Sequence, residues 1–297
     1  MRYWGGLGNI LFQIAATVAY SYMVNRKFIL DKHPSLPNLE NYSPESIELA
    51  DSEYANMLKE YSEEEIAKNI PFPENPHIKL TGFFQNYSLF DKYRDYIFYI
   101  IGLPKLRSDT LPIIQGPVFQ KKNLFQKNIP TVSLHIRRGD YEQIPCYFLL
   151  INQYYYRLAL LHILGRISGK VNVIVFYERN SRESANKIVD LLKNDTELAR
   201  LDFHDFNDLL DEQQSGGVTD IEEMVIMSQC DHHIIANSTY SWWSAYINQK
   251  LHKIVCYPDQ FYNHQLYYLS IKGLEVDGWT SIPAWNPQEY KCSCYGQ

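Results

Sequence analysis

Short apolar runs alternate with stretches of helical spacing along the second half of this 297-residue chain. The apolar runs are rich in β-branched residues and predict strands at residues 131–136, 171–176, 233–236 and 253–255. Stretches in which apolar residues recur every three or four positions predict helices at residues 154–164, 182–192, 221–229 and 237–248. Alternation of this kind predicts a parallel, doubly wound α/β sheet.

The first half of the chain opens on a cluster of glycines, Gly5-Gly6-Leu7-Gly8-Asn9. Apolar residues spaced for one face of a helix follow at 11–23, and residues 28–30 predict a short strand. A glycine-rich turn, a helix and a strand make half of a βαβ unit, and the glycines let a ligand or a neighbouring domain approach the backbone. Ordinary turn formation explains such a cluster equally well. A further strand is predicted at 78–85 and a helix at 93–101.

Two lobes are expected from the chain length and from the placement of its irregular segments. Residues 31–76 hold six prolines and an acidic stretch, which predicts a surface excursion with a helix that begins at Ser43. Residues 104–130 have mixed composition and weak periodicity, which is typical of a connection between domains. We therefore expect one lobe over residues 1–128 and a second over residues 129–297.

Composition and charge exclude several classes of function. The net charge is −6 and no block of lysine and arginine occurs, so the chain lacks the electrostatic signature of a nucleic-acid-binding protein. No apolar run approaches the roughly 20 residues of a membrane span, and the N-terminus Met1-Arg2-Tyr3-Trp4-Gly5 lacks the apolar region of a signal peptide, so we expect a cytoplasmic protein. The five cysteines are odd in number and irregularly spaced, which predicts free thiols and no zinc site.

Two adjacent arginines, Arg137 and Arg138, follow the strand predicted at 131–136 and precede Gly139. A strand that ends in two guanidinium groups presents permanently charged forks that suit a pyrophosphate. A solvated strand end with ion-paired arginines is the alternative. The acidic pair Asp-x-Asp, which holds a divalent metal against a diphosphate in many sugar-nucleotide enzymes, does not occur in the sequence. A bound diphosphate would therefore depend on protein cations and backbone amides.

A second polar turn, Asn237-Ser238-Thr239, lies between a predicted strand and the helix that carries Trp242 and Trp243. All three residues are good helix N-caps, so the turn can serve the helix alone. The same turn directs free N–H groups and the positive end of the helix dipole at an incoming anion. Ligands of doubly wound sheets bind beyond the carboxyl ends of the strands, where both this turn and the arginine turn are expected. The tryptophans are expected in the core.

Five segments together resemble the ordered motifs of the inverting α-1,2-fucosyltransferases, glycosyltransferase family eleven, over nearly the whole chain. These segments are Gly5-Gly6-Leu7-Gly8-Asn9 with Phe12-Gln13, Gly82-Phe83-Phe84-Gln85, His135-Ile136-Arg137-Arg138-Gly139-Asp140-Tyr141, Tyr155-Tyr156-Arg157-Leu158-Ala159, and Met227-Ser228-Gln229-Cys230 with Ile234-Ile235-Ala236-Asn237-Ser238-Thr239-Tyr240-Ser241-Trp242-Trp243. The Arg-Arg-Gly-Asp and Asn-Ser-Thr-x-Ser-Trp-Trp motifs are specific in combination.

The resemblance implies a GT-B-like fold, in which two Rossmann-type lobes face each other across a cleft. The N-terminal lobe would bind the acceptor and the C-terminal lobe the nucleotide sugar. The implied reaction transfers L-fucose from GDP-β-L-fucose to the 2-hydroxyl of a galactoside with inversion and without a metal or other cofactor. The implied setting is lipopolysaccharide or capsule biosynthesis in the bacterial cytoplasm, with lipid-linked glycans as possible acceptors at the inner membrane and no nucleic acid as partner.

The resemblance also assigns roles to particular residues. Arg137 would grip the diphosphate and stabilise the charge that develops as the glycosidic bond breaks. Asp140 is a candidate base, or else a brace for the turn, and Asn9 either faces the reacting centre or caps the first helix. Gln85 would lie on the acceptor side. The residues expected to bind the donor are His135, Arg138, Gly6, Gly8, Asn237, Ser238, Thr239 and Ser241.

The sequence departs from the family pattern at three places. Ile10 stands where the family generally has glutamine, Tyr177-Glu178-Arg179 stands where the family usually has Ser-Asp-Asp, and the strand before Gly5 is short. Two other functions therefore stay open. One is a transferase for another nucleotide sugar, with a changed pocket around residues 177–179 and 203–216. The other is a non-catalytic protein that binds a GDP-sugar or a carbohydrate.

Overall fold

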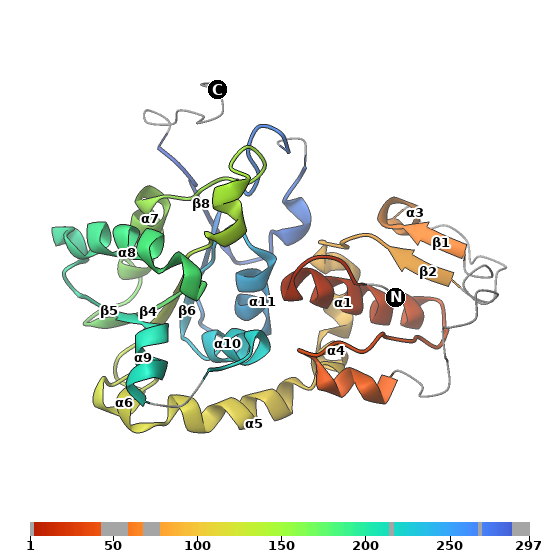
Figure 1. Cartoon of the computed structure of the whole chain (residues 1–297), viewed down its shortest axis with the longest axis horizontal. Coiled ribbons are helices and arrows are strands. Elements are labelled where there is room, and N and C mark those ends of the chain that lie inside the picture. The colour runs from red at the N-terminus through yellow and green to blue at the C-terminus, as the bar shows by residue number, and fades with distance from the viewer. Residues whose placement is uncertain (1–2, 43–58, 68–77, 214–216, 267–268, 287–297) are drawn as a thin grey trace. The chain divides into compact units, whose positions relative to one another are not determined.

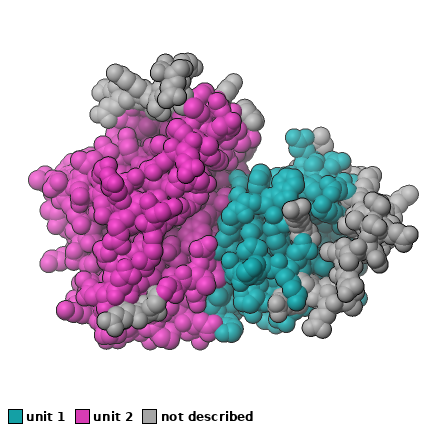
Figure 2. Space-filling view, in the orientation of Figure 1, with its two compact units in different colours: residues 1–106 teal, residues 107–297 magenta. Residues whose placement is uncertain are grey.

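The computed structural model describes residues 3–42, 59–67, 78–213, 217–266 and 269–286 (Figure 1). The chain divides into two compact units, residues 1–106 and residues 107–297 (Figure 2). The helix predicted from Ser43 lies outside the described residues. No helix in the described ranges combines the length and the apolar character that crossing a bilayer requires.

The second unit is built on a six-stranded sheet in which every neighbouring pair is parallel. Its strands, in spatial order, are β5 (Leu201–Asp205), β4 (Val171–Phe176), β3 (Thr131–His135), β6 (His232–Ile234), β7 (Val255–Pro258) and β8 (Thr280–Ile282). All residues of β3 and β4 are buried, as parallel strands covered on both faces require. The prediction of an α/β fold is confirmed.

Helices cover both faces of this sheet (Figure 1). On β4, Val173 and Val175 join the apolar cluster that contains residues of α7 and α8, whereas Ile174 and Phe176 join the cluster that contains residues of α6, α9 and α10. Side chains of a strand alternate between its faces, so one apolar strand serves two cores. The helices are α5 (Leu103–Ile114), α6 (Pro117–Lys121), α7 (Gln153–Leu164), α8 (Arg182–Lys193), α9 (Phe206–Gln213), α10 (Asp220–Met227) and α11 (Thr239–Ile247).

A buried polar chain links β3, β6 and the end of α11. The Asn248 side chain accepts from the Lys250 N–H at 2.8 Å and donates to the Cys230 carbonyl at 2.9 Å, which fixes the orientation of its amide. The same amide nitrogen lies 2.7 Å from His233 Nε2, so this ring nitrogen accepts. His233 therefore carries its proton on Nδ1 and donates to Ser133 Oγ at 2.7 Å. The imidazole is a neutral structural link between two strands.

The first unit is smaller and mainly helical in its described part. Its elements are α1 (Leu7–Met23), η1 (Pro37–Tyr42), β1 (Lys59–Ser62), α3 (Glu63–Ala67), β2 (Ile78–Thr81), η2 (Tyr87–Leu89), η3 (Asp91–Tyr93) and α4 (Arg94–Ile100), with β1 and β2 paired in parallel. The helix predicted at 11–23 is confirmed. The strand predicted at 28–30 is wrong, because these residues have irregular backbone structure.

Residues 104–130, expected to connect two lobes, are largely helical and belong to the second unit from Arg107 onward. Phe119 of α6 packs in the same cluster as Phe206 of α9, so the segment completes one core of the sheet. The compact units therefore divide after Leu106, whereas the pattern of the sequence places the division after residue 128. Which lobe binds donor and which binds acceptor stays a prediction.

The cysteines differ in their state. Cys230 and Cys256 are free and buried, and burial raises the pKa of both thiols. Cys146 is disulfide-bonded, so the expectation of five free thiols is wrong there. An odd number of cysteines excludes complete pairing but permits a single bond.

Candidate functional site

The arginine turn after β3 and the polar turn after β6 lie at one edge of the sheet. β3 pairs with β6 in parallel, so both strands deliver the chain to the same side. The Tyr141 hydroxyl donates to the carbonyl oxygen of Asn237 at 3.0 Å, and the ring centroids of His135 and Tyr240 lie 5.7 Å apart. The structure thus brings together the two motifs that the sequence singled out.

Arg137 is held on three sides. Its Nη1 donates to Glu178, its Nη2 donates to Asp140 Oδ1 at 2.6 Å, and its guanidinium carbon lies 5.0 Å from the centroid of the Tyr141 ring. The side chain is 22% exposed, so the fork is reachable from solvent while its orientation is fixed. An arginine restrained in this way is preorganised for a planar, bidentate anion contact.

Three buried side-chain nitrogens in this segment have no hydrogen-bond partner among the described residues. They are Nδ1 of His135, Nε of Arg137 and Nη1 of Arg138. Arg138 is 8% exposed, and its other terminal nitrogen donates to the Ile151 carbonyl at 2.6 Å. Buried polar groups are nearly always satisfied, so the unpartnered N–H groups of the two arginines at this strand end favour a place for an anion.

His135 is neutral in this setting. Burial, and next the positive charge of Arg137, lower the pKa of the imidazole to about 3. Its backbone carbonyl accepts from the Tyr156 hydroxyl at 3.1 Å, which ties the strand end to α7. At neutral pH the positive charge of the site therefore comes from Arg137 and Arg138 alone.

Gly139 lets the chain turn between the arginines and the following short helix. Its φ of +49° lies in the left-handed region, and its N–H donates to Ser181 Oγ at 2.9 Å. A Cβ at this position would lie 2.0 Å from Glu178 Oε2. The backbone conformation therefore favours glycine here, and a larger residue would displace the Glu178 carboxylate.

The polar residues 237–241 build their own turn. Asn237 is buried, and its amide nitrogen donates to the carbonyls of Leu149 and Phe261, each at 2.8 Å. Ser238 caps α11 by accepting from the Tyr240 N–H at 3.3 Å.

Ser241 completes this turn from inside α11. It is buried, accepts from the Ala236 N–H and donates to the Ser238 carbonyl, each at 3.2 Å. Thr239 is the first residue of α11 and is partly exposed. The side chains of Asn237 and Ser241 thus shape the start of α11, and the helix start itself is what the turn presents at the sheet edge.

Glu223 is a residue of this region that the sequence interpretation did not single out. It lies in the first turn of α10, whose N-cap Thr219 forms a capping box with Glu222. Burial raises the pKa of Glu223 to about 7, and its Oε1 lies 3.3 Å from the Tyr240 hydroxyl. From the sequence alone, Glu223 is indistinguishable from the other acidic residues in the first turn of α10. Only its contact with Tyr240 in the folded protein marks it as part of this region.

In the first unit, Asn9 and Gln85 meet although 76 positions separate them. Gln85 Nε2 donates to Asn9 Oδ1 at 2.9 Å. The N-cap of α1 is Gly6, so Asn9 lies in the first turn of the helix and does not cap it. A Cβ on Gly6 would meet no atom within 4 Å, so packing does not require glycine there, and Gly8 is buried in α1. Ile10, which replaces the family's glutamine, is buried in the core.

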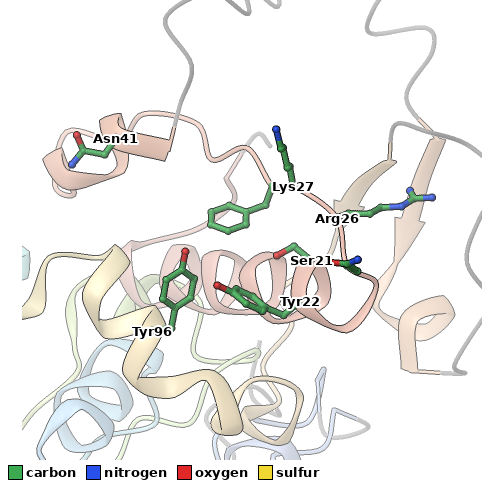
Figure 3. Close-up of a pocket in the computed structure, with 8 residues that line it drawn as sticks. Ser21, Tyr22, Arg26, Lys27, Asn41 and Tyr96 are labelled. Carbon is green, nitrogen blue, oxygen red and sulfur yellow. The ribbon is translucent and has the colours of Figure 1, made fainter.

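A pocket of about 490 Å³ also lies in the first unit (Figure 3). It lies beside the C-terminal end of α1, and the rings of Tyr22 and Tyr96 are 5.1 Å apart between their centroids. Its lining consists of Ser21, Tyr22, Asn25, Arg26, Lys27, Phe28, Asn41 and Tyr96. Among the described residues that line it, there is none that the sequence predicted for donor or acceptor binding.

This doubly wound unit carries two arginines at the carboxyl ends of its strands, the edge at which enzymes of this architecture bind their ligands. The sequence model of glycosyl transferase family 11 matches residues 57–270. The chain therefore belongs to glycosyltransferase family 11, and the resemblance in the sequence motifs is confirmed.

Two curated relatives from Escherichia coli are similar over most of the chain. The O-antigen biosynthesis glycosyltransferase WbnK is 30% identical over 235 residues, which cover 76% of this chain and 68% of that protein. An alpha-1,2-colitosyltransferase is 26% identical over 276 residues, which cover 82% of this chain and 85% of that protein. Among solved structures, a mutant of Arabidopsis thaliana FUT1 in complex with GDP matches 85% of this chain and 68% of that chain, at 10% identity and a TM-score of 0.45.

Proposed function

We propose that this glycosyltransferase moves L-fucose from GDP-β-L-fucose to the 2-hydroxyl of a galactoside, with inversion and without a metal. The observation that carries the proposal is the set of unpartnered nitrogens on His135, Arg137 and Arg138 beside the start of α11. Two guanidinium groups and a helix N-terminus supply the positive field that a leaving GDP needs. Family membership and the motifs of the sequence support the same reaction.

Arg137 contributes most where negative charge develops, on the diphosphate oxygen that leaves the sugar. Arg138 is anchored by its hydrogen bond to the Ile151 carbonyl, and neutral His135 adds no charge to the site at neutral pH. Asp140 is 60% exposed and paired with Arg137, which suits a brace for the turn better than a base. Asn9 has a carboxamide, which cannot take a proton at neutral pH, so its part is to orient the acceptor with Gln85.

A second donor is supported by a relative. One similar protein carries the name of an alpha-1,2-colitosyltransferase, and colitose is L-fucose without its 3-hydroxyl group. The other is named for O-antigen biosynthesis, which suggests a glycan of the lipopolysaccharide as acceptor, lipid-linked at the inner face of the membrane. We take GDP-fucose as the first donor and GDP-colitose as the alternative.

The proposal is tested with a donor panel. The purified protein is incubated with GDP-fucose, GDP-colitose, GDP-mannose and UDP-galactose, each with a β-galactoside acceptor, with and without EDTA. We expect GDP release and a new α-1,2 linkage in the NMR spectrum of the product with GDP-fucose, unchanged by EDTA. Turnover of GDP-colitose alone would select the alternative donor. Binding of GDP without release of sugar from any donor would indicate a non-catalytic binding protein.

The acceptor side gives a second prediction. Gln85→Ala removes the hydrogen bond to Asn9, so we expect a KM for the acceptor about tenfold higher, with the Kd for GDP unchanged. Gln120→Ala, at an exposed glutamine of α6, is the matched control and should leave both constants at the wild-type value. An unchanged acceptor KM in Gln85→Ala would remove this pair from acceptor binding.

A further inference from the structure

Glu178 lies two residues after β4, and its carboxylate covers the turn that carries Arg137. One oxygen accepts from Arg137 Nη1, and the other lies against Gly139. Ser181, three residues later, accepts from the Gly139 N–H at 2.9 Å. Oxygen atoms of residues 178–181 therefore occupy donor groups of the turn that an anion would use.

We propose that Glu178 is a resident competitor for the diphosphate of the donor. Its carboxylate binds Arg137 when the nucleotide is absent, gives way when the GDP-sugar binds, and returns to promote release of GDP. This inference rests on the proposed function, because it takes a nucleoside diphosphate as the ligand of Arg137.

Carboxylates outnumber the arginines around this turn. Glu178 and Asp140 both pair with this one guanidinium, and Glu142 lies 3.8 Å from Arg138. Three carboxylates thus surround two cations, so the turn with its partners has no net positive charge to offer. A diphosphate would meet like charge unless at least one carboxylate moves away.

Glu178 is the carboxylate that can leave at small cost. Its side chain is 40% exposed, so the ion pair exchanges easily with water. Asp140 is more exposed, at 60%, but it lies on the same short turn as Arg137, three residues away, so the turn keeps its carboxylate near the guanidinium. The neighbours of Glu178 are engaged elsewhere, since the Tyr177 hydroxyl donates to Asp205.

The return of the Glu178 carboxylate to Arg137 would also speed the release of GDP. GDP carries more negative charge than the GDP-sugar and would bind a bare Arg137 more tightly. A carboxylate tethered on the next strand end acts at high effective concentration and competes as soon as the nucleotide loosens. The same residue therefore weakens binding of the donor and shortens the residence of the product.

The test is the Kd for GDP of Glu178→Gln, measured by titration calorimetry on the full chain. Glutamine keeps the size of the side chain and removes its charge, so we expect binding about tenfold tighter and a correspondingly slower dissociation of GDP in stopped-flow experiments. Glu183→Gln is the matched control, because Glu183 is exposed on α8 and pairs with Lys187. It changes the net charge equally and should leave the Kd within a factor of two.

The other outcomes overturn the inference. Weaker binding of GDP to Glu178→Gln would mean that Glu178 holds Arg137 in place for the ligand. Unchanged binding would mean that the pair does not limit access, and equal tightening in Glu183→Gln would reduce the effect to overall charge. Each of these results leaves turnover of GDP-fucose by the wild type intact, whereas a wild type that neither binds GDP nor turns over any donor removes the proposed function as well.

Discussion

Arg137→Ala is expected to lower turnover about 100- to 1,000-fold while the protein stays folded. In the proposed reaction the guanidinium stabilises the charge that develops on the leaving diphosphate, and its loss leaves Arg138 with one terminal nitrogen already bound to a backbone carbonyl. The measurement is GDP release from GDP-fucose with a saturating β-galactoside. Binding of GDP should weaken less than turnover falls, because the interaction strengthens in the transition state.

Two further variants decide how the effect arises. Arg137→Lys keeps the charge but loses the bidentate fork, so we expect it to restore only a small part of the lost turnover. Arg166→Ala removes an exposed arginine just beyond the C-terminal end of α7, away from the site, and should retain wild-type turnover. Full activity in Arg137→Ala would remove this residue from the mechanism, and an equal loss in Arg166→Ala would point to a general effect of charge.

The strands that the sequence predicts best are those buried on both faces. Residues 171–176 form β4 with the predicted bounds, because an unbroken apolar run has only one stable place in a covered parallel sheet. β5 and β8 are missed. They are the two edges of the sheet, partly exposed and polar, so they lack the pattern that marks a central strand.

Helix α5 is missed for a different reason. Pro112 lies inside it, and a proline in a helix interior is an argument against a helix when only the sequence is known. The polar residues of the helix also blur its periodicity. The segment is also held by the packing of the following α6 on α9, and this long-range contact leaves no pattern in the local sequence.

The arginine turn and the polar turn 237–239 could be placed together from the sequence alone, since parallel strands deliver them to one sheet edge. The partners of Arg137 could be only half predicted. Asp140 is three residues away, whereas Glu178 reaches Arg137 only because β4 lies beside β3. The hydrogen bonds of Asn237 to Leu149 and Phe261 depend in the same way on distant loops.

His135→Phe is expected to make the protein less sensitive to acid. The ordinary pKa of histidine is about 6.5, and in the folded protein burial and Arg137 hold that of His135 near 3. Below pH 6.5 His135 therefore binds a proton in the unfolded chain but not in the folded protein. The contribution of neutral His135 to the free energy of unfolding is complete above this pH and is lost as the pH falls. At pH 5.0 one such histidine lowers the free energy of unfolding by about 2 kcal/mol.

The pKa values of other buried groups are also shifted by folding, which is why the comparison must be made between two proteins. The pKa of His233 is also lowered by burial, but its partners Ser133 and Asn248 make substitution there costly. Glu223 acts in the opposite direction, because its raised pKa makes acidification relieve a buried charge. These contributions are common to wild type and variant and cancel in the difference.

The difference in free energy of unfolding between His135→Phe and wild type should therefore grow by about 2 kcal/mol from pH 7.5 to pH 5.0, in favour of the variant. At pH 7.5 the two should be close, since a phenyl ring keeps the contact with Tyr240 and removes the unpartnered Nδ1. Denaturant unfolding followed by tryptophan fluorescence reports the second unit, which holds four of the five tryptophans. His252→Phe, at an exposed position, is the surface control. If the free energy of unfolding depended on pH equally in His135→Phe and wild type, His135 would take up its proton in the folded state. The end of β3 at His135 would then be open to water.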